Sequence, residues 1–181
     1  MGERGGRADC STPAMRALPT GLVSGLAATV PMSVAMEVMN RELPVRRKEP
    51  FPPRLITRRM ARRAGVEREL DEGEHRAVAW VSHFGYGGAM GAVYGLVDER
   101  VRARLPRAVR GMPPVVLDVA QGVAFGLGVW AASYLGWLPA AGIMKPATRQ
   151  GPATNAVIVA SHVVYGAALG WIAGAKRRRG R

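Results

Sequence analysis

The chain has 181 residues, of which 48% are hydrophobic and 22% charged, and it carries a formal net charge of +13. In a soluble protein such a charge would point to nucleic acid or another polyanion. Here the cations lie between long uncharged runs, and aromatic side chains that could stack on bases are not interleaved with them. The pattern therefore argues against nucleic acid binding and against a water-soluble basic domain.

Four apolar runs follow one another along the chain. Residues 18–36, 77–97 and 155–175 contain no Asp, Glu, Lys or Arg, and residues 112–144 contain a single carboxylate, Asp118. Each run reaches the ~20 residues that cross a bilayer core. The sequence therefore predicts an all-α fold with four transmembrane helices, between a basic N-terminal tail (1–17) and a basic C-terminal tail (176–181).

The loop after the first span predicts a short interfacial helix. From Arg54 to Ala64, apolar side chains share one face and arginines occupy the rest. This basic amphipathic pattern suits a helix lying on a membrane surface, although a solvated charged helix fits it as well. Asp71 followed by Glu74 has the spacing of a capping box, which predicts the start of the second span.

Spans two and four match at a fixed offset of 79 residues. Seven of the fourteen positions 82–95 are identical to their counterparts, and residues 82–87 answer residues 161–166 most closely. Spans one and three match more weakly, with Gly21 and Gly25 resembling Gly122 and Gly126. We predict two hairpin repeats, at about 18–97 and 113–175. Because each copy has an even number of spans, the copies should be parallel, about an axis along the membrane normal.

Glycines recur at four-residue intervals in every span. Small residues at this spacing let helix backbones approach closely in lipid, so we predict that the glycines pack helix against helix and leave homodimerisation open. The predicted packing residues are Gly21, Gly25, Gly87, Gly91, Gly95, Gly122, Gly126, Gly166, Gly170 and Gly174.

Polar residues within the spans form the only candidate site. An ionisable group at membrane depth is costly and is usually paired, lines a cavity or has a function. We predict an intramembrane polar pocket of Glu37, Ser82, His83, Tyr86, Ser161, His162 and Tyr165, with Asp118 and Gln121 as further membrane-embedded polar residues in the opposite half.

Three interpretations of this pocket remain open. In the first, the histidines are neutral hydrogen-bonding partners between helices and the protein is purely structural. In the second, the pocket handles a proton, an ion or a small solute, since histidine titrates near neutrality. In the third, His83 and His162 are axial ligands of a haem b in a redox subunit.

Other chemistry lacks its sequence signals. GxSxG, HExxH and Walker motifs are absent, as is a GxGxxG after a strand, and the single cysteine, Cys10, gives no CxxC metal site. We therefore expect a non-enzymatic protein with no metal and, haem b aside, no cofactor.

The motifs resemble an uncharacterised family of bacterial inner-membrane proteins, the YagU type. The resemblance rests on Pro52-Pro53-Arg54, Ser82-His83, Ser161-His162 with Tyr165, and the basic residues 176–179. It implies a multi-pass protein of the bacterial inner membrane with a cytoplasmic C-terminus, and no reaction or cofactor. The density of cations favours both termini inside, and the juxtamembrane arginines predict contacts with the bilayer and its anionic phospholipid head groups.

Overall fold

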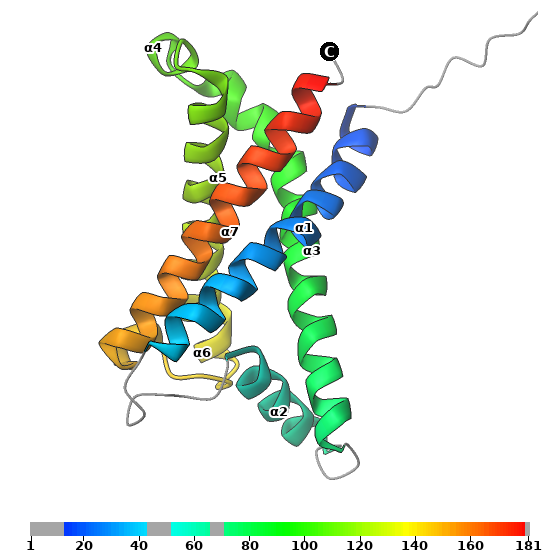
Figure 1. Cartoon of the computed structure of the whole chain (residues 1–181), viewed down its shortest axis with the longest axis vertical. Helices are drawn as coiled ribbons and strands as arrows, with labels where there is room; N and C mark the ends of the chain where they lie inside the picture. The colour runs from blue at the N-terminus through cyan, green and yellow to red at the C-terminus, as the bar shows by residue number, and fades with distance from the viewer. Residues whose placement is uncertain (1–12, 43–51, 66–70, 180–181) are drawn as a thin grey trace, which may run out of the picture.

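The computed structural model describes residues 13–42, 52–65 and 71–179, and every regular element in them is helical. Most of the predicted N-terminal tail, including Cys10, and the last two residues of the C-terminal tail lie outside these ranges. The elements are α1 (Pro13–Arg41), α2 (Pro52–Ala64), α3 (Glu72–Arg104), α4 (Arg107–Arg110), α5 (Pro114–Ala131), the π-helical η3 (Ala132–Trp137), α6 (Leu138–Ala140), the short 3-10 turn η4 (Ala147–Arg149) and α7 (Pro152–Arg179) (Figure 1).

Three segments of the described chain are long and apolar enough to cross a membrane: Ala17–Arg41, Pro114–Ala140 and Pro152–Arg179. The helix predicted as the second span, α3, is 33 residues long but is not among them. Its middle carries His83, Tyr86 and Tyr94 among closely spaced glycines, and these residues lower its hydropathy. The structure is thus that of an all-helical protein with three clear membrane-type helices.

The start of α3 has the predicted capping box. The Asp71 side chain accepts a hydrogen bond from the Glu74 amide at 2.8 Å, and the Glu74 side chain accepts one from the Asp71 amide at 2.8 Å. Reciprocal bonds of this kind satisfy amides that the first helical turn leaves free. They fix where α3 begins.

Two antiparallel helix pairs, α1 with α3 and α5 with α7, contain the closest backbone contacts. A Cβ at Gly91 would collide with Gly21 and Gly25, and a Cβ at Gly170 would collide with Asp118 and Gly122. All ten predicted packing glycines lie at such crossings, where an added Cβ would meet the facing helix. Glycine is needed here because any side chain would hold the two backbones apart.

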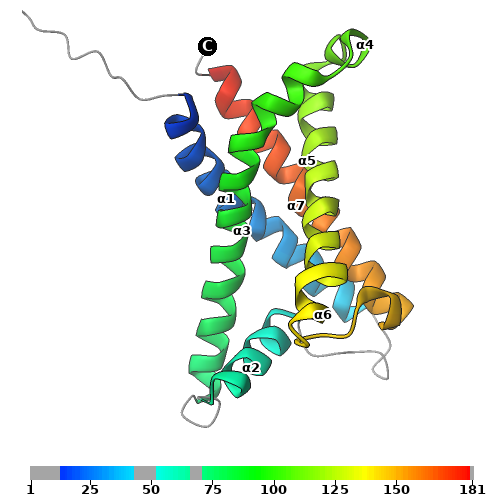
Figure 2. The ribbon, with the colours of Figure 1, turned by 180° about the vertical axis from the view of Figure 1, so that it is seen from behind.

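The two pairs pack on each other unevenly. Helices α1 and α7 are in extensive contact, whereas α3 and α5 touch little, and they diverge from α4 toward α2 (Figure 2). One buried core cluster joins α1, α3 and α7 through Met32, Tyr94 and Leu169, among others. A second lies beneath, where Leu138, Ile143 and other residues around α6 meet Ile158 of α7. The start of α1 and the end of α7 lie at the same end of the molecule (Figure 1).

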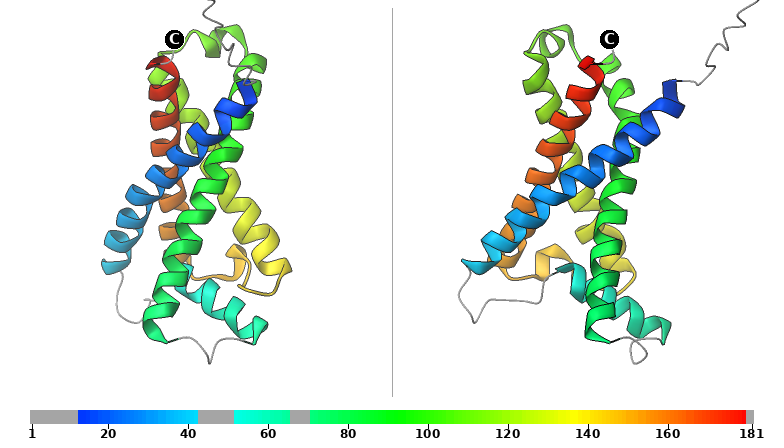
Figure 3. Two further views of the ribbon diagram at one scale, coloured as in Figure 1. Left: turned by 90° about the vertical axis from the view of Figure 1, so that its right-hand side faces the viewer. Right: turned by 45° about the vertical axis from the view of Figure 1, so that its right-hand side comes forward.

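Helix α2 forms at the predicted place but packs against protein. Leu55 and Ile56 lie against the second core cluster, and the Arg59 guanidinium donates to the Ile143 carbonyl at 2.6 Å. Arg63 likewise donates to the Ala141 carbonyl. Figure 3 shows α2 across the lower end of the bundle, beside the start of α3. The apolar face expected to meet a membrane surface therefore covers the bundle core, although Met60 remains half exposed.

Candidate functional site

A cavity of about 240 Å³ lies between α1, α2, α3 and α7 and the segment formed by α5, η3 and α6. We call it the histidine cavity, because His83 and His162 both line it. The other polar lining residues are Thr29, Thr57, Ser82, Tyr86, Ser133, Tyr134, Trp137 and Tyr165. Methionines from three helices, Met32, Met36, Met60 and Met90, supply much of the apolar wall.

His162 is held in one orientation. Its Nδ1 lies 2.8 Å from the Ile158 carbonyl, one helical turn earlier, and its ring meets Tyr134 edge to face, with centroids 5.8 Å apart. A carbonyl oxygen can only accept, so the proton is on Nδ1. In the neutral ring Nε2 is then the acceptor, which suits a ligand that donates a hydrogen bond.

Two tyrosines join helices across the cavity. The Tyr165 hydroxyl of α7 donates to the Gly87 carbonyl of α3 at 2.6 Å. The Tyr86 hydroxyl of α3 lies 2.9 Å from Ser133 Oγ of η3, and its ring lies beside Trp137, with centroids 6.4 Å apart. Tyr165 is buried, whereas Tyr86 is 37% exposed. The two tyrosines occupy matching positions in the sequence but stabilise different contacts.

The π-helical segment η3 shapes one wall of the cavity. Within it Gly136 leaves helical geometry, with φ −103° and ψ −105°. A wider helical turn places side chains where an α-helix would not, and such turns are frequent at functional sites. Here Ser133, Tyr134 and Trp137 line the cavity together. Apolar periodicity gives no sign of this segment.

Five of the seven predicted pocket residues meet at this cavity: Ser82, His83, Tyr86, His162 and Tyr165. Glu37 does not, since its half-exposed carboxylate pairs with Arg41 at 3.1 Å on the outside of α1. Ser161 is fully buried, but it donates to the Val157 carbonyl of its own helix at 2.7 Å and does not line the cavity. No described lining residue is charged.

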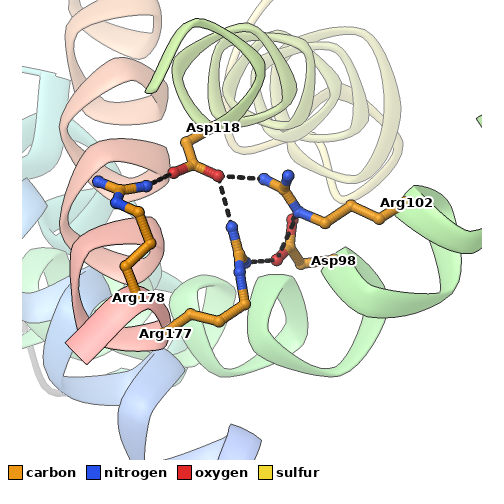
Figure 4. A network of polar contacts seen from close by, with 5 residues as sticks. All are labelled: Asp98, Arg102, Asp118, Arg177 and Arg178. Atoms are coloured by element: carbon orange, nitrogen blue, oxygen red, sulfur yellow. Dashed lines mark hydrogen bonds and ion pairs between the residues drawn. The ribbon is translucent and has the colours of Figure 1, made fainter. Parts of the chain in front are cut away.

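Asp118 lies at the other end of the bundle, in a cluster that we call the arginine–aspartate cluster (Figure 4). Its carboxylate is fully buried and pairs with Arg102 of α3 and with Arg177 and Arg178 of α7. Asp98 completes the cluster by pairing with Arg102 at 3.0 Å and with Arg177. Three guanidinium groups and two carboxylates thus join three helices. Gly174 makes room for them, since a Cβ there would collide with the Asp118 side chain.

From the sequence we predicted Asp118 as a membrane-embedded polar residue, but not the other four members of the cluster. A buried carboxylate needs a counter charge, and Asp98 and Arg102 lie one turn apart on α3. Moreover, Arg177 follows Asp98 by the same 79 residues that relate spans two and four. These signals could have revealed the cluster. Gln121 lies apart from it, and neither of its amide atoms has a hydrogen-bond partner in the part of the chain that the structure describes.

Comparison of the chain with models of known families, with curated proteins and with solved structures gives no match. In the described residues no group of three or more His, Cys, Asp or Glu side chains could hold a metal ion. The histidine cavity and the arginine–aspartate cluster are thus the two features of the described residues that bear on function.

Proposed function

We propose that this chain is a four-span integral membrane protein whose histidine cavity binds a small solute without chemical conversion. The observation that carries the solute-binding proposal is the cavity itself: it has a volume of about 240 Å³, its lining is mostly apolar, and His83, His162 and several hydroxyl groups lie on its walls. Ligand sites typically combine an apolar wall with a few polar groups that orient the ligand.

The outer surface supports a position in the membrane. Large apolar side chains are exposed along the long helices, including Val34 of α1 at 58%, Val81 of α3 at 72% and Trp171 of α7 at 55%. Soluble monomers rarely expose such extended apolar surface, whereas lipid accepts it. We count α3 as the fourth span, since residues 77–97 carry no charge and α3 packs along α1.

The glycine contacts support a duplicated hairpin. Gly91 meets Gly21 and Gly25, and its counterpart 79 residues later, Gly170, meets Asp118 and Gly122. Asp118 and Gly122 follow Gly21 and Gly25 by 97 residues. The contacts therefore align α1 with α5 at an offset of 97 residues, which differs by one helical turn from the alignment of Gly21 with Gly122 in the sequence. Both hairpins then share one crossing, which is the geometry expected of parallel repeats.

The bacterial inner membrane remains the proposed location, with both termini in the cytoplasm. The start of α1 and the end of α7 share one end of the molecule (Figure 1), as an even number of spans requires. Arginines of α3, α4 and α7 gather at that end, with Lys176. A dense group of cations next to the membrane favours the cytoplasmic side.

A proton path and a haem site receive less support. Glu37 and Asp118, the carboxylates that a proton path would use, both lie away from the cavity. A volume of about 240 Å³ is below the ~300–1,000 Å³ of ordinary cofactor and ligand pockets, so the residues do not fit a haem macrocycle. A solute of the size of a phenol fits better, since apolar cavities of about 150 Å³ bind benzene.

The membrane assignment and the binding site can be tested separately. Extraction of membranes with alkaline carbonate should leave the protein in the pellet, and release into the supernatant would reject the assignment. For binding, purified protein in detergent is titrated with 4-fluorophenol while the fluorine NMR signal of the probe is recorded. We expect saturable broadening for the wild type.

Two alanines of α3 provide a matched pair of variants. Ala79 is buried and lines the cavity, whereas Ala89 is exposed on the same helix. We expect Ala79→Phe to abolish the broadening and Ala89→Phe to retain it. If Ala79→Phe does not fold, Ala79→Leu tests the same point with a smaller side chain. Equal binding by folded variants at both positions would reject the cavity as the site.

A further inference from the structure

We propose that the ligand of the histidine cavity is a neutral lipophilic molecule that enters sideways from the bilayer, between α3 and η3, past a latch made by Tyr86 and Ser133. This inference rests on the proposed binding function and adds the class of ligand and its route.

Burial differs sharply around the cavity wall. The residues that α1 and α7 contribute, such as Met36 and Tyr165, are at most 6% exposed. Among the described residues that line the cavity, four are exposed: Met60, Ser82, Tyr86 and Trp137. They belong to α2, α3 and η3, so the cavity has its mouth on the side away from α1 and α7.

The mouth opens where the bundle is least closed. Helices α3 and α5 make few contacts and diverge toward α2 (Figure 2). Between α3 and η3 the hydroxyl groups of Tyr86 and Ser133 lie 2.9 Å apart, and Trp137 lies beside Tyr86. A single neutral hydrogen bond of this kind is weak in a membrane protein, so thermal motion can break it easily.

Exposed apolar side chains flank the mouth residues along α3 and η3. Val78 and Val81 of α3 are 41% and 72% exposed, and Leu135 of η3 is 46% exposed. In a membrane these side chains face lipid, so the mouth faces lipid as well. By contrast, Pro53, Ile56 and Thr57 of α2 cover the cavity and are not exposed, so that Met60 is the one exposed side chain among the described lining residues of this helix. Arg59 and Arg63 fix α2 to the loop around α6.

The chemistry of the wall selects a neutral ligand. No described lining side chain carries a fixed charge, so an ion entering from lipid would lose its hydration without gaining a counter charge. Methionines adapt to ligands of varied shape, and His162 Nε2 can accept one hydrogen bond. A neutral molecule with one donor, such as a phenol or an alcohol, satisfies both requirements.

The test uses the full-length protein in phospholipid vesicles and measures association and dissociation rates of 4-fluorophenol by fluorine NMR exchange. Tyr86→Phe removes the latch, and we expect both rates to rise about threefold, as loss of one intramembrane hydrogen bond implies. Tyr94→Phe is the matched control: it removes the same atom from the same helix outside the cavity, and it should keep wild-type rates.

Two further arms identify the other outcomes. The double variant Arg59→Ala with Arg63→Ala loosens α2; if it accelerates exchange while Tyr86→Phe does not, the ligand enters from the aqueous side and the proposal is overturned. The anion 4-fluorobenzoate should not bind, and equal binding of the anion would overturn the neutral class. Absence of 4-fluorophenol binding in the wild type would instead reject the proposed function.

Discussion

At the end of the bundle near α4, five charged side chains are bound to one another, whereas near α2 an uncharged set of imidazole and hydroxyl groups surrounds an open volume. Both ends contain polar residues that an apolar environment penalises. At the charged end, every group of the arginine–aspartate cluster is paired with an opposite charge, and this pairing offsets the cost. At the cavity end, this cost is offset by hydrogen bonds from side chains to backbone carbonyls and by a hydrogen bond between two hydroxyl groups. Because His162 donates through Nδ1, its Nε2 can accept a hydrogen bond from a ligand. This contrast supports a stabilising role for the first end and the proposed binding role for the second.

Breaking the charged end should have the largest effect on stability. Asp118→Asn removes the fully buried carboxylate that pairs with three arginines, leaving cations close together. We expect the free energy of unfolding to fall by about 3 kcal/mol, the low end for a broken buried pair, because the arginines are partly exposed. Denaturation in detergent micelles measures it. Glu37→Gln, which breaks an exposed pair, is the control and should cost about 0.5 kcal/mol or less.

The helix crossings between the two ends should be the next most sensitive. Gly170→Ala would press a methyl group into the Asp118 carbonyl, and overpacking of this kind costs about 1–3 kcal/mol. Gly91→Ala should cost a similar amount if the hairpins are true repeats. At Gly128 an added Cβ meets nothing within 4 Å, so Gly128→Ala should stabilise the helix by about 0.5–1 kcal/mol. Denaturation curves of the three variants give the sign of each change in the free energy of unfolding. A Gly170→Ala variant as stable as the wild type would contradict the close helix crossing.

Loosening α2 should have a smaller effect. Arg59→Ala removes the 2.6 Å bond to the Ile143 carbonyl, and we expect a loss of about 1 kcal/mol because the arginine is exposed. Limited proteolysis within α2 should then proceed faster, while the arginine–aspartate cluster stays intact. Arg62→Ala on the same helix is not a suitable control, since Arg62 has interactions of its own.

The smallest effect is expected at the mouth of the cavity. Tyr86→Phe removes the bond to Ser133 and should lower the free energy of unfolding by about 0.6 kcal/mol. Unfolding curves measured side by side with those of Asp118→Asn would show the contrast between the two ends. A loss at Tyr86 as large as that at Asp118 would mean that the mouth is a structural element.

The sequence predicted the helices well and the cavity partly. Uncharged runs and the Asp71–Glu74 pattern place the long helices, because length, hydropathy and capping are local properties. The match at an offset of 79 residues identified His83 and His162 as candidate site residues, and both line the cavity. The prediction that Glu37 belongs to the pocket was wrong. The position of Glu37 in the sequence indicates its depth along α1, but it does not show that the side chain pairs with Arg41 on the outer face.

The features that we could not predict depend on contacts between segments that are far apart in the sequence. The π-helical turn at Gly136 has no periodic signal, and the inward side of α2 is decided by the loop around α6 that it contacts. The uneven packing of the two hairpins likewise has no counterpart in the sequence. The cavity lies where α1 packs against α7 and α3 makes few contacts with α5.

The arginine–aspartate cluster also predicts the order in which its charged residues can pair while the chain is synthesised. Arg102 precedes Asp118 by sixteen residues and pairs with it, whereas its other partners, Arg177 and Arg178, are synthesised a full hairpin later. We therefore expect Arg102 to be the first counter-ion of Asp118 in the growing chain. We expect the complete cluster to form once the last turn of α7 has been made.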